Sequence, residues 1–198
     1  MPSAPRKSVI LSFDDGPAPI SALTKILTTL KKNSIRAEFY VLGSEVQRYR
    51  SGAVSIVSQK HKIHNHSWSH KNLATASKRD VQSELEKTQK IIKEVTGEIA
   101  TKVRPPYGRG GWPPFDPELN QVARALKLTI QNWDIDTKDW ASPKGIGQKK
   151  LDAIKKQFQQ KGSQTVLNVL MHVQDPTARD LEGFIAKLKE WGFSFANP

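Results

Sequence analysis

Cysteine is absent from the 198 residues of the chain. Its absence excludes a disulfide scaffold, a thiolate metal site and a cysteine nucleophile. Long apolar runs are absent too, because none approaches the roughly 20 residues that cross a bilayer. The segment Met1–Lys7 lacks the apolar stretch of a signal peptide. Such a sequence is expected of a cytoplasmic protein, or of one whose export signal has been removed.

Acidic residues are few, at 19 against 31 Lys and Arg, so the net charge is +12 at pH 7. This excess suggests a polyanionic partner, either nucleic acid or an anionic cell envelope. The paired lysines are dispersed, however, at Lys31-Lys32, Lys149-Lys150 and Lys155-Lys156. No strip of basic residues alternates with aromatic ones, as it does where a protein follows a nucleic-acid backbone. The charge is therefore interpreted as a generally cationic, solvated surface.

Strand patterns alternate with helix patterns along the chain, and no linker, repeat or low-complexity segment interrupts them. Strands are predicted at 8–13, 37–41, 62–65, 102–104, 128–133, 165–171 and 193–196. Helices are predicted at 20–33, within 44–59, and at 78–96, 117–126, 144–160 and 177–191. Alternation of this kind predicts an α/β fold in which helices wrap a parallel sheet. About seven strands predict a compact, incomplete barrel over a single domain, residues 1–198, with its chemistry at the carboxyl ends of the strands.

The clearest predicted helix is Lys78–Thr96. Ser77 and Asp80 have the spacing of a capping box at its start. Gly97 is placed to end the helix, because a glycine accepts the left-handed conformation of a C-terminal cap.

Two adjacent aspartates, Asp14 and Asp15, follow the first predicted strand. Consecutive acids suit the interior of a strand poorly, and Gly16-Pro17 forces a turn, so both carboxylates are expected at a rim. Such a pair can divide two tasks, one carboxylate binding a metal and the other acting as a base. The alternative is an ordinary acidic turn.

His66 and His70 follow the third predicted strand and are four residues apart. On a helical turn both imidazoles would face the same way. With Asp15 they would make a three-ligand site with open positions, the pattern of catalytic zinc. The same set could hold iron(II) for an oxygenase, which leaves Asp14 without a role. Histidines also commonly bridge surface polar groups without binding a metal.

The segment from Arg104 through Pro105, Pro106 and Tyr107 to Gly108 ends the fourth predicted strand. Two prolines fix the backbone and the glycine frees it, so a stiff turn would present specific N–H groups. The N–H of Tyr107 could point at a developing oxyanion, and Arg104 could hold the base by charge-assisted hydrogen bonds. The alternative is a rigid structural loop.

His172 closes the apolar run 166–171, which places it at the same edge of the barrel. An aspartate beside it would raise the pKa of the imidazole and hold it ready as a general acid. Three acids, Asp134, Asp136 and Asp139, follow the fifth predicted strand and are expected to cap helices or hydrate a loop. His61 and His64 are interpreted as structural or solvated.

Five blocks, in order and at strand ends, resemble the polysaccharide deacetylases of carbohydrate esterase family 4, the NodB-homology domain. They are Ser-Phe-Asp-Asp-Gly-Pro, Asn-His-Ser-Trp-Ser-His, Arg-Pro-Pro-Tyr-Gly, Asp-Thr-Lys-Asp-Trp and Leu-Met-His. The resemblance covers essentially the whole chain. It implies a distorted (β/α)7 barrel, similar to a TIM barrel. It also implies metal-dependent removal of acetyl groups, usually from N-acetylglucosamine polymers.

The resemblance also implies roles for single residues. Asp14 matches the catalytic base, and Arg104 the residue that orients it. The positions of the three metal ligands match Asp15, His66 and His70. For the metal, Zn²⁺ is expected, with Co²⁺ or another divalent ion as alternatives.

Tyr107 matches the oxyanion donor. Asp139 matches the acid that tethers the general acid His172. Trp140 and Leu170 match apolar walls of the acetyl pocket. Trp112, in a segment that departs from the family pattern, is expected to offer an aromatic face to a sugar ring, as Tyr107 is. Two further departures are Ser12, where the family usually has Thr, and His64, where Gly is common; together these changes bear on substrate fit.

The expected reaction is removal of N-acetyl groups from N-acetylglucosamine residues of a polysaccharide. The positive charge favours peptidoglycan over chitin oligosaccharides, with acetylxylan as a further alternative. A catalytically inactive glycan-binding module is the non-enzymatic alternative, and retention of every motif residue argues against it. A nucleic-acid partner would explain the charge but none of the five motifs. The protein is expected to be a secreted or periplasmic monomer without a transmembrane segment.

Overall fold

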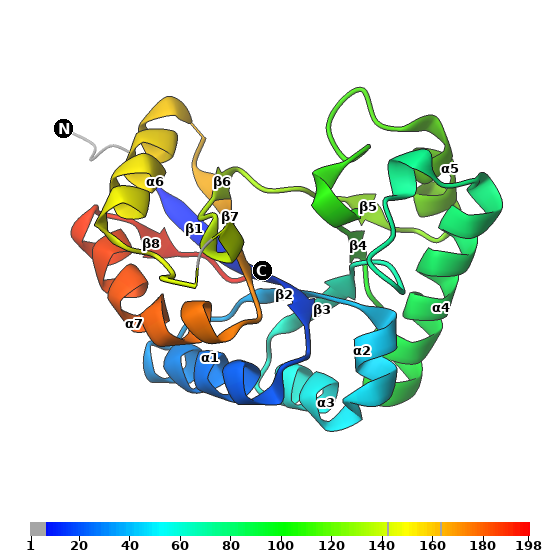
Figure 1. Ribbon diagram of the computed structural model, residues 1–198, viewed down its shortest axis with the longest axis horizontal. Coiled ribbons are helices and arrows are strands. Elements are labelled where there is room, and N and C mark those ends of the chain that lie inside the picture. The colour runs from blue at the N-terminus through cyan, green and yellow to red at the C-terminus, as the bar shows by residue number, and fades with distance from the viewer. Residues whose placement is uncertain (1–6, 142, 163) are drawn as a thin grey trace.

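A computed structural model describes residues 7–141, 143–162 and 164–198. In it, a strongly curled sheet lines the inside of the molecule and helices surround it (Figure 1). No helix in these ranges is long and apolar enough to cross a membrane. The first six residues of the segment Met1–Lys7 lie outside the described ranges. The prediction of one domain over residues 1–198 stays a prediction.

Every strand pair in the sheet is parallel. The strands are β1 (Ser8–Gly16), β2 (Glu38–Val41), β3 (Lys62–Asn65), β4 (Lys102–Val103), β5 (Thr129–Ile130), β6 (Ile135–Asp136), β7 (Val166–His172) and β8 (Ser194–Phe195). Seven of them follow the order β5-β4-β3-β2-β1-β7-β6, and β8 pairs with β1. The predicted distorted (β/α)7 barrel is confirmed. Because all strands run the same way, their carboxyl ends meet at one edge.

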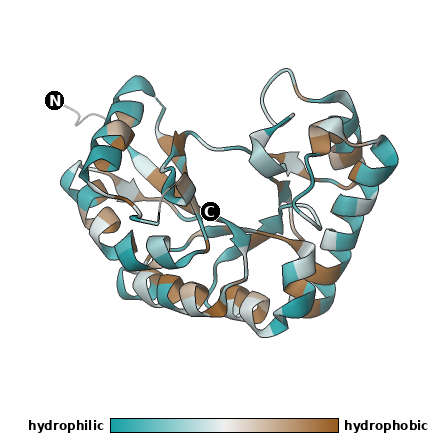
Figure 2. Ribbon diagram, in the orientation of Figure 1, coloured by the Kyte–Doolittle hydropathy of each residue, from teal (hydrophilic) through white to brown (hydrophobic). Residues whose placement is uncertain are grey.

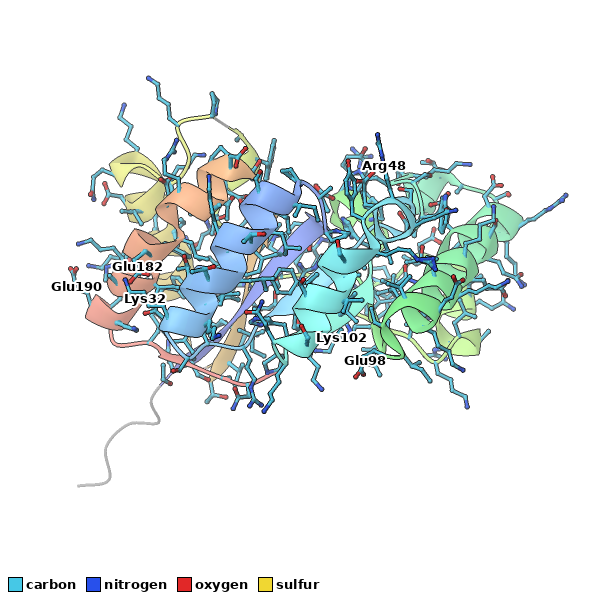
Figure 3. The ribbon with its side chains drawn as sticks, turned by 90° about the horizontal axis from the view of Figure 1, so that it is seen from below. Lys32, Arg48, Glu98, Lys102, Glu182 and Glu190 are labelled. Atoms are coloured by element: carbon cyan, nitrogen blue, oxygen red, sulfur yellow. The ribbon has the colours of Figure 1, made fainter. Side chains whose placement is uncertain are left out.

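Helices cover the outer face of the curled sheet (Figure 1). They are α1 (Ile20–Lys32), α2 (Gly43–Arg48), α3 (Arg50–Ser58), α4 (Lys78–Thr96), α5 (Pro117–Ala125), α6 (Gln148–Gln160) and α7 (Asp175–Glu190), with short 3-10 turns at Leu73–Thr75, Pro106–Gly108 and Asp139–Ala141. Their apolar residues face inward and their polar residues face out, as the colouring in Figure 2 shows. Exposed charged side chains accordingly cover the underside of the molecule (Figure 3).

The barrel is open between β5 and β6. The connecting segment 131–134 crosses this opening instead of extending the sheet (Figure 1). The strand predicted at 128–133 is therefore shorter, and Ile135–Asp136 forms a strand that the sequence patterns did not predict. A two-residue strand carries too little alternation to be recognised, and β6 exists because it pairs with β7.

The helix predicted within 44–59 is two helices, α2 and α3. They meet at Tyr49, whose φ of −125° and ψ of 57° are not helical. The structure shows one of the two hydrogen bonds of the capping box predicted for α4, since the side chain of Ser77 accepts from the backbone N–H of Asp80; the predicted C-terminal cap is confirmed, because Gly97 has a φ of 75°. The first strand continues past its predicted end at Phe13 to Gly16, and so contains both aspartates.

Side chains on the two faces of the strands differ in polarity. In β1, Val9, Leu11 and Phe13 belong to the apolar core shared with the surrounding helices. The intervening Ser12 and Asp14 point to the inside of the barrel, where both contact Arg104. In β2 and β7 the outward residues are likewise apolar, whereas Glu38, Tyr40 and Asn168 point inward. The sheet therefore has an apolar outer layer and a polar interior, because strand side chains alternate in direction.

Two glycines allow a matched test of the α4 cap. An added Cβ would meet no atom within 4 Å at either Gly97 or Gly183, the second of which lies within α7. Gly97→Ala should lower the free energy of unfolding by about 1–2 kcal/mol, because its positive φ disfavours a side chain. Gly183→Ala should raise it by about 0.5–1 kcal/mol, because alanine suits a helix interior better. Urea denaturation measures both changes, and equal effects would contradict the cap assignment.

Candidate active site

A cavity of about 510 Å³ opens at the carboxyl edge of the sheet. Its lining combines acids, histidines and aromatic residues: Asp14, Asp15, His66, His70, Tyr107, Arg109, Trp133, Asp136, Trp140, Leu170 and His172. Eight of these eleven were singled out from the sequence as site residues. The structure thus brings together segments that are far apart in the chain.

The two adjacent aspartates face different partners. Asp14, at 2% exposure, receives a hydrogen bond from Arg104 Nη1 on Oδ1 at 2.6 Å. Asp15 faces the two histidines instead. The register of β1 against β2 shifts between Asp14 and Gly16, and Asp15 has a φ of 67°. This irregularity separates the two carboxylates, which in a regular strand would simply alternate between faces.

Asp15, His66 and His70 can hold a metal ion. Among the described residues, they form a group whose potential ligand atoms all lie within 4.8 Å of one another. Asp15 Oδ1 lies 3.5 Å from His66 Nε2 and 3.4 Å from His70 Nε2. This oxygen is buried and has no hydrogen-bond partner in the described part of the chain. A cation between the three groups would satisfy it, and one carboxylate with two imidazoles is a known ligand set of catalytic zinc.

The two histidines come together through a loop and not through the predicted helical turn. The residues 66–70 form no helix, and Ser67 and His70 have positive φ values of 69° and 62°. Helix α4 holds this loop, because Glu84 Oε2 accepts the backbone N–H groups of Trp68 at 2.9 Å and Ser69 at 2.8 Å. Ser67 Oγ accepts the backbone N–H of His70 at 3.1 Å.

The protonation of each candidate ligand follows from its neighbours. Burial opposes ionisation of Asp15, but contacts with His66, His172 and His70 outweigh it and hold its pKa at about 2. Burial also opposes the charged form of His66, yet Asp14 and Asp15 raise its pKa. For His70, burial lowers the pKa, and the attraction of Asp15 offsets this only in part. A cation competes with protons for the imidazole nitrogens of both histidines, so metal affinity is expected to fall in acid.

His66 is oriented by the backbone. Its Nδ1 lies 2.7 Å from the carbonyl oxygen of Arg104. Because a carbonyl only accepts hydrogen bonds, Nδ1 carries the proton and Nε2 is directed to the cavity side, toward Asp15.

The guanidinium of Arg104 is fully buried beneath Asp14. Its N–H groups reach acceptors in every direction: Asp14 Oδ1, Ser12 Oγ, Asn168 Oδ1 and the carbonyl oxygens of Gln131 and Asn132. The ring of Tyr40 lies against it, 3.9 Å from its central carbon. Such an arrangement leaves a buried charge with none of its donors unpaired.

Asp139 holds His172. Its Oδ1 lies 2.8 Å from Nδ1 of His172, and its Oδ2 accepts the backbone N–H of His172 at 2.7 Å and the hydroxyl of Thr177. Burial opposes the charged imidazole, but the carboxylate of Asp139 outweighs it and raises the pKa of His172 to about 9. The imidazole is therefore protonated at neutral pH, with Nε2 left for the cavity. Asp139 is not the loop-hydrating acid that its position after the fifth strand suggested.

The remaining predicted site residues are apolar or aromatic. Leu170 is buried and Trp140 is 59% exposed, and both line the cavity. Trp112 lies outside the lining and packs edge-on against Trp133, with ring centroids 5.6 Å apart. Tyr107 has a positive φ of 62° and packs edge-on against His70, with ring centroids 4.7 Å apart.

Three lining residues were missed as site residues: Arg109, Trp133 and Asp136. Asp136 belongs to the fourth quoted block, which was the available signal, and Arg109 directly follows the third. Trp133 carried no signal, because its position depends on the crossing segment 131–134. His61 and His64, which were interpreted as structural or solvated, are both buried. Burial agrees with the structural interpretation of these two histidines.

Comparison with known proteins gives a consistent set of similarities. A family model described as polysaccharide deacetylase matches residues 2–131. The peptidoglycan-N-acetylglucosamine deacetylase PgdA of Listeria monocytogenes is 35% identical over 191 residues, which are 96% of this chain and 37% of that protein. The chain thus spans little more than a third of the length of this relative.

Two solved structures are similar over nearly the whole chain. The peptidoglycan deacetylase PdaC from Bacillus subtilis has a TM-score of 0.79 at 30% identity, covering 97% of this chain and 88% of that one. A carbohydrate esterase family 4 pseudoenzyme from Bacillus anthracis has a TM-score of 0.81 at 28% identity, covering 98% and 64%. Since one of these neighbours is a pseudoenzyme, the fold by itself does not establish activity.

The contact between Asp139 and His172 makes a testable prediction. In the metal-free protein, NMR titration should give His172 a pKa near the value of about 9. Asp139→Asn should lower that pKa, because burial is then opposed only by the attraction of Asp14 and Asp15. Asp136→Asn, which removes a cavity carboxylate that makes no hydrogen bond to His172, should change it little.

The same pair affects stability. The pKa of His172 is higher in the folded chain than its ordinary 6.5, so its stabilising contribution is present below about pH 6.5 and is lost as the pH rises through about 9. If the pKa of His172 stays near 9 in both Asp139→Asn and Asp136→Asn, Asp139 is not the cause of the raised pKa.

Proposed function

Because the chain belongs to the polysaccharide deacetylase family, we propose that it is a metal-dependent N-deacetylase of N-acetylglucosamine residues in peptidoglycan. One observation carries the proposal. A single cavity holds a carboxylate supported by Arg104, a separate group of three side chains that could hold a metal ion, and an imidazole supported by Asp139. An inactive glycan-binding module would not need this division of labour.

The proposed metal ligands are Asp15, His66 and His70, and the proposed ion is Zn²⁺. The orphaned Asp15 oxygen and the backbone-oriented His66 support this choice. A divalent ion held by these residues would supply Lewis-acid chemistry: it would polarise the acetyl carbonyl and lower the pKa of a water molecule.

Asp14 is the proposed base. Arg104 occupies Oδ1 of its carboxylate, while Oδ2 lies 3.7 Å from His66 Nε2 on the side of the metal ligands. This oxygen is placed to take the proton of a water as the water attacks the acetyl carbonyl carbon. The N–H of Tyr107 is the proposed donor to the oxyanion that then forms.

His172 is the proposed general acid. It is protonated at neutral pH through Asp139, and it faces the same cavity as Asp14. Transfer of its Nε2 proton to the amine nitrogen would allow the C–N bond to break, giving acetate and a free amino sugar. Leu170 and Trp140 are the proposed walls for the acetyl methyl group, and Trp112 and Tyr107 the aromatic faces for a sugar ring.

The choice of peptidoglycan rests on two observations. The relative PgdA is named as a peptidoglycan-N-acetylglucosamine deacetylase, and PdaC as a peptidoglycan-N-acetylmuramic acid deacetylase. The net charge of +12 also suits an anionic cell wall better than uncharged chitin. A chitin deacetylase of Amylomyces rouxii is 33% identical over 132 residues, so chitin oligomers are the second candidate substrate. A wall substrate implies action outside the cytoplasm, and we propose that the protein acts there as a monomer.

The direct test is acetate release from peptidoglycan, chitin oligomers and acetylxylan. Peptidoglycan should give the highest rate, a chelator should abolish release, and added Zn²⁺ should restore it. A preference for chitin oligomers or acetylxylan would overturn the choice of substrate. The enzyme assignment itself fails if none of the three releases acetate from protein that holds its metal.

The neighbouring aspartates provide a matched pair of variants. Asp14→Asn should lower kcat by about a hundredfold to ten-thousandfold, because a positioned base is lost. It should keep its affinity for Zn²⁺. Asp15→Asn should lose both activity and about a hundredfold or more in Zn²⁺ affinity, since even partners that only orient ligands are worth about 10–100-fold. Isothermal titration with Zn²⁺ measures metal affinity, and acetate release measures kcat. If the two variants change both quantities alike, the assignment of Asp14 as base and Asp15 as metal ligand is wrong.

A further inference from the structure

A buried polar group below Arg104 takes no part in the roles assigned above. It consists of Asn168 on β7 and Glu38 on β2, both inside the barrel and both nearly without solvent contact. We propose that these two are positioning residues that hold Arg104 so that it binds only one oxygen of Asp14. This inference rests on the proposed function, because it explains how the proposed base stays available.

Asn168 is the direct link to Arg104. Its side-chain oxygen accepts Arg104 Nη2 at 2.8 Å, and its side-chain nitrogen donates to Glu38 Oε2 at 3.0 Å. The hydroxyl of Ser12 lies 2.7 Å from the same Asn168 oxygen and accepts Arg104 Nη1 at 3.0 Å. The amide can satisfy both neighbours in only one orientation, so Glu38 determines which atom of Asn168 faces the guanidinium.

Glu38 is held in turn by Tyr40 and Lys102. Tyr40 donates its hydroxyl to Oε2 at 3.0 Å, and Lys102 Nζ lies 2.5 Å from Oε1. Lys102 is labelled on the underside of the molecule in Figure 3 and reaches Glu38 from there. His64 Nε2 is 3.7 Å from the same Oε1. Burial opposes ionisation, but His64 and Lys102 outweigh it and hold the pKa of Glu38 at about 2, so the carboxylate is charged.

This arrangement dictates how Arg104 meets Asp14. An arginine and a carboxylate commonly form two parallel hydrogen bonds, which would occupy both oxygens of Asp14. Here Nη2 is engaged by Asn168, and only Nη1 reaches Asp14, at Oδ1. Oδ2 is therefore left to accept a proton. If Asn168 or the charge of Glu38 were lost, the guanidinium could turn and cover the second oxygen.

The test uses three variants of the metal-loaded protein. Asn168→Leu keeps the branched shape of the side chain but removes its hydrogen bonds with Arg104, Glu38 and Ser12. Glu38→Gln removes the charge while keeping a polar side chain. Both should lower kcat on the order of tenfold to a hundredfold, with KM and Zn²⁺ affinity unchanged, because a small misplacement of a catalytic group has effects of that size. His61→Gln is the control: it is another buried polar residue of the barrel, bonded to the backbone N–H of Ala37, and should leave kcat unchanged.

A double-mutant cycle separates positioning from a general structural role. In an Arg104→Lys background, Asn168→Leu should cause no further loss of kcat, because the group it positions has gone. Losses that multiply would overturn the proposal, as would unchanged kcat in both single variants. If Asn168→Leu does not fold, Glu38→Gln takes its place in the same double-mutant cycle with Arg104→Lys.

A readout without activity keeps this inference distinct from the proposed function. NMR of the Arg104 guanidinium should show slow rotation in the wild type and in His61→Gln, and faster rotation in Asn168→Leu. If wild-type protein releases no acetate, the proposed function fails while this measurement still decides the positioning role. Equal rates of guanidinium rotation in the wild type, His61→Gln and Asn168→Leu would contradict the positioning role of Asn168.

Discussion

The buried guanidinium of Arg104 is the constraint on which the rest of the site depends. A charge moved out of water costs several kcal/mol unless it is fully paired, so the barrel interior must provide an acceptor for each of its N–H groups. Those acceptors come from β1, β7 and the segment 131–134. The polar interior of the sheet, the opening between β5 and β6 and the position of Asp14 are therefore parts of one arrangement.

The parallel sheet turns this constraint into a site. Alternate residues of each strand pack against helices, and the others point inward, so polar groups from β1, β2 and β7 meet inside the barrel. At the carboxyl edge the register shift in β1 separates Asp14 from Asp15. Asp14 faces the buried guanidinium of Arg104, and Asp15 faces the two imidazoles of His66 and His70. Two residues adjacent in the chain thereby enter different electrostatic surroundings, which is what distinct proposed tasks require.

The imidazoles of His70 and His172, which both line the cavity, differ for the same kind of reason. Burial lowers the pKa of His70, whose attraction to Asp15 is too weak to compensate, whereas the direct contact with Asp139 raises that of His172. A neutral imidazole suits a metal ligand and a protonated one suits a proton donor. The neighbouring carboxylates, rather than the histidines themselves, set the difference. Because one structural neighbour is a pseudoenzyme, the fold alone does not establish activity. The surroundings of the single side chains in the cavity matter for that reason.

The sequence by itself determined the alternation of strands and helices, the caps of α4 and the set of polar residues at strand ends, because these depend on local periodicity and short-range hydrogen bonds. Tertiary structure decided what depends on partners distant in the chain. It ended α2 before Tyr49, created β6 beside β7, and carried the segment 131–134 across the open side of the barrel. It also brought His66 and His70 together through a loop held by Glu84 on α4, where the four-residue spacing had suggested a helical turn. Above all it placed Asn168 and Glu38 under Arg104, a contact across 130 residues that no local pattern records.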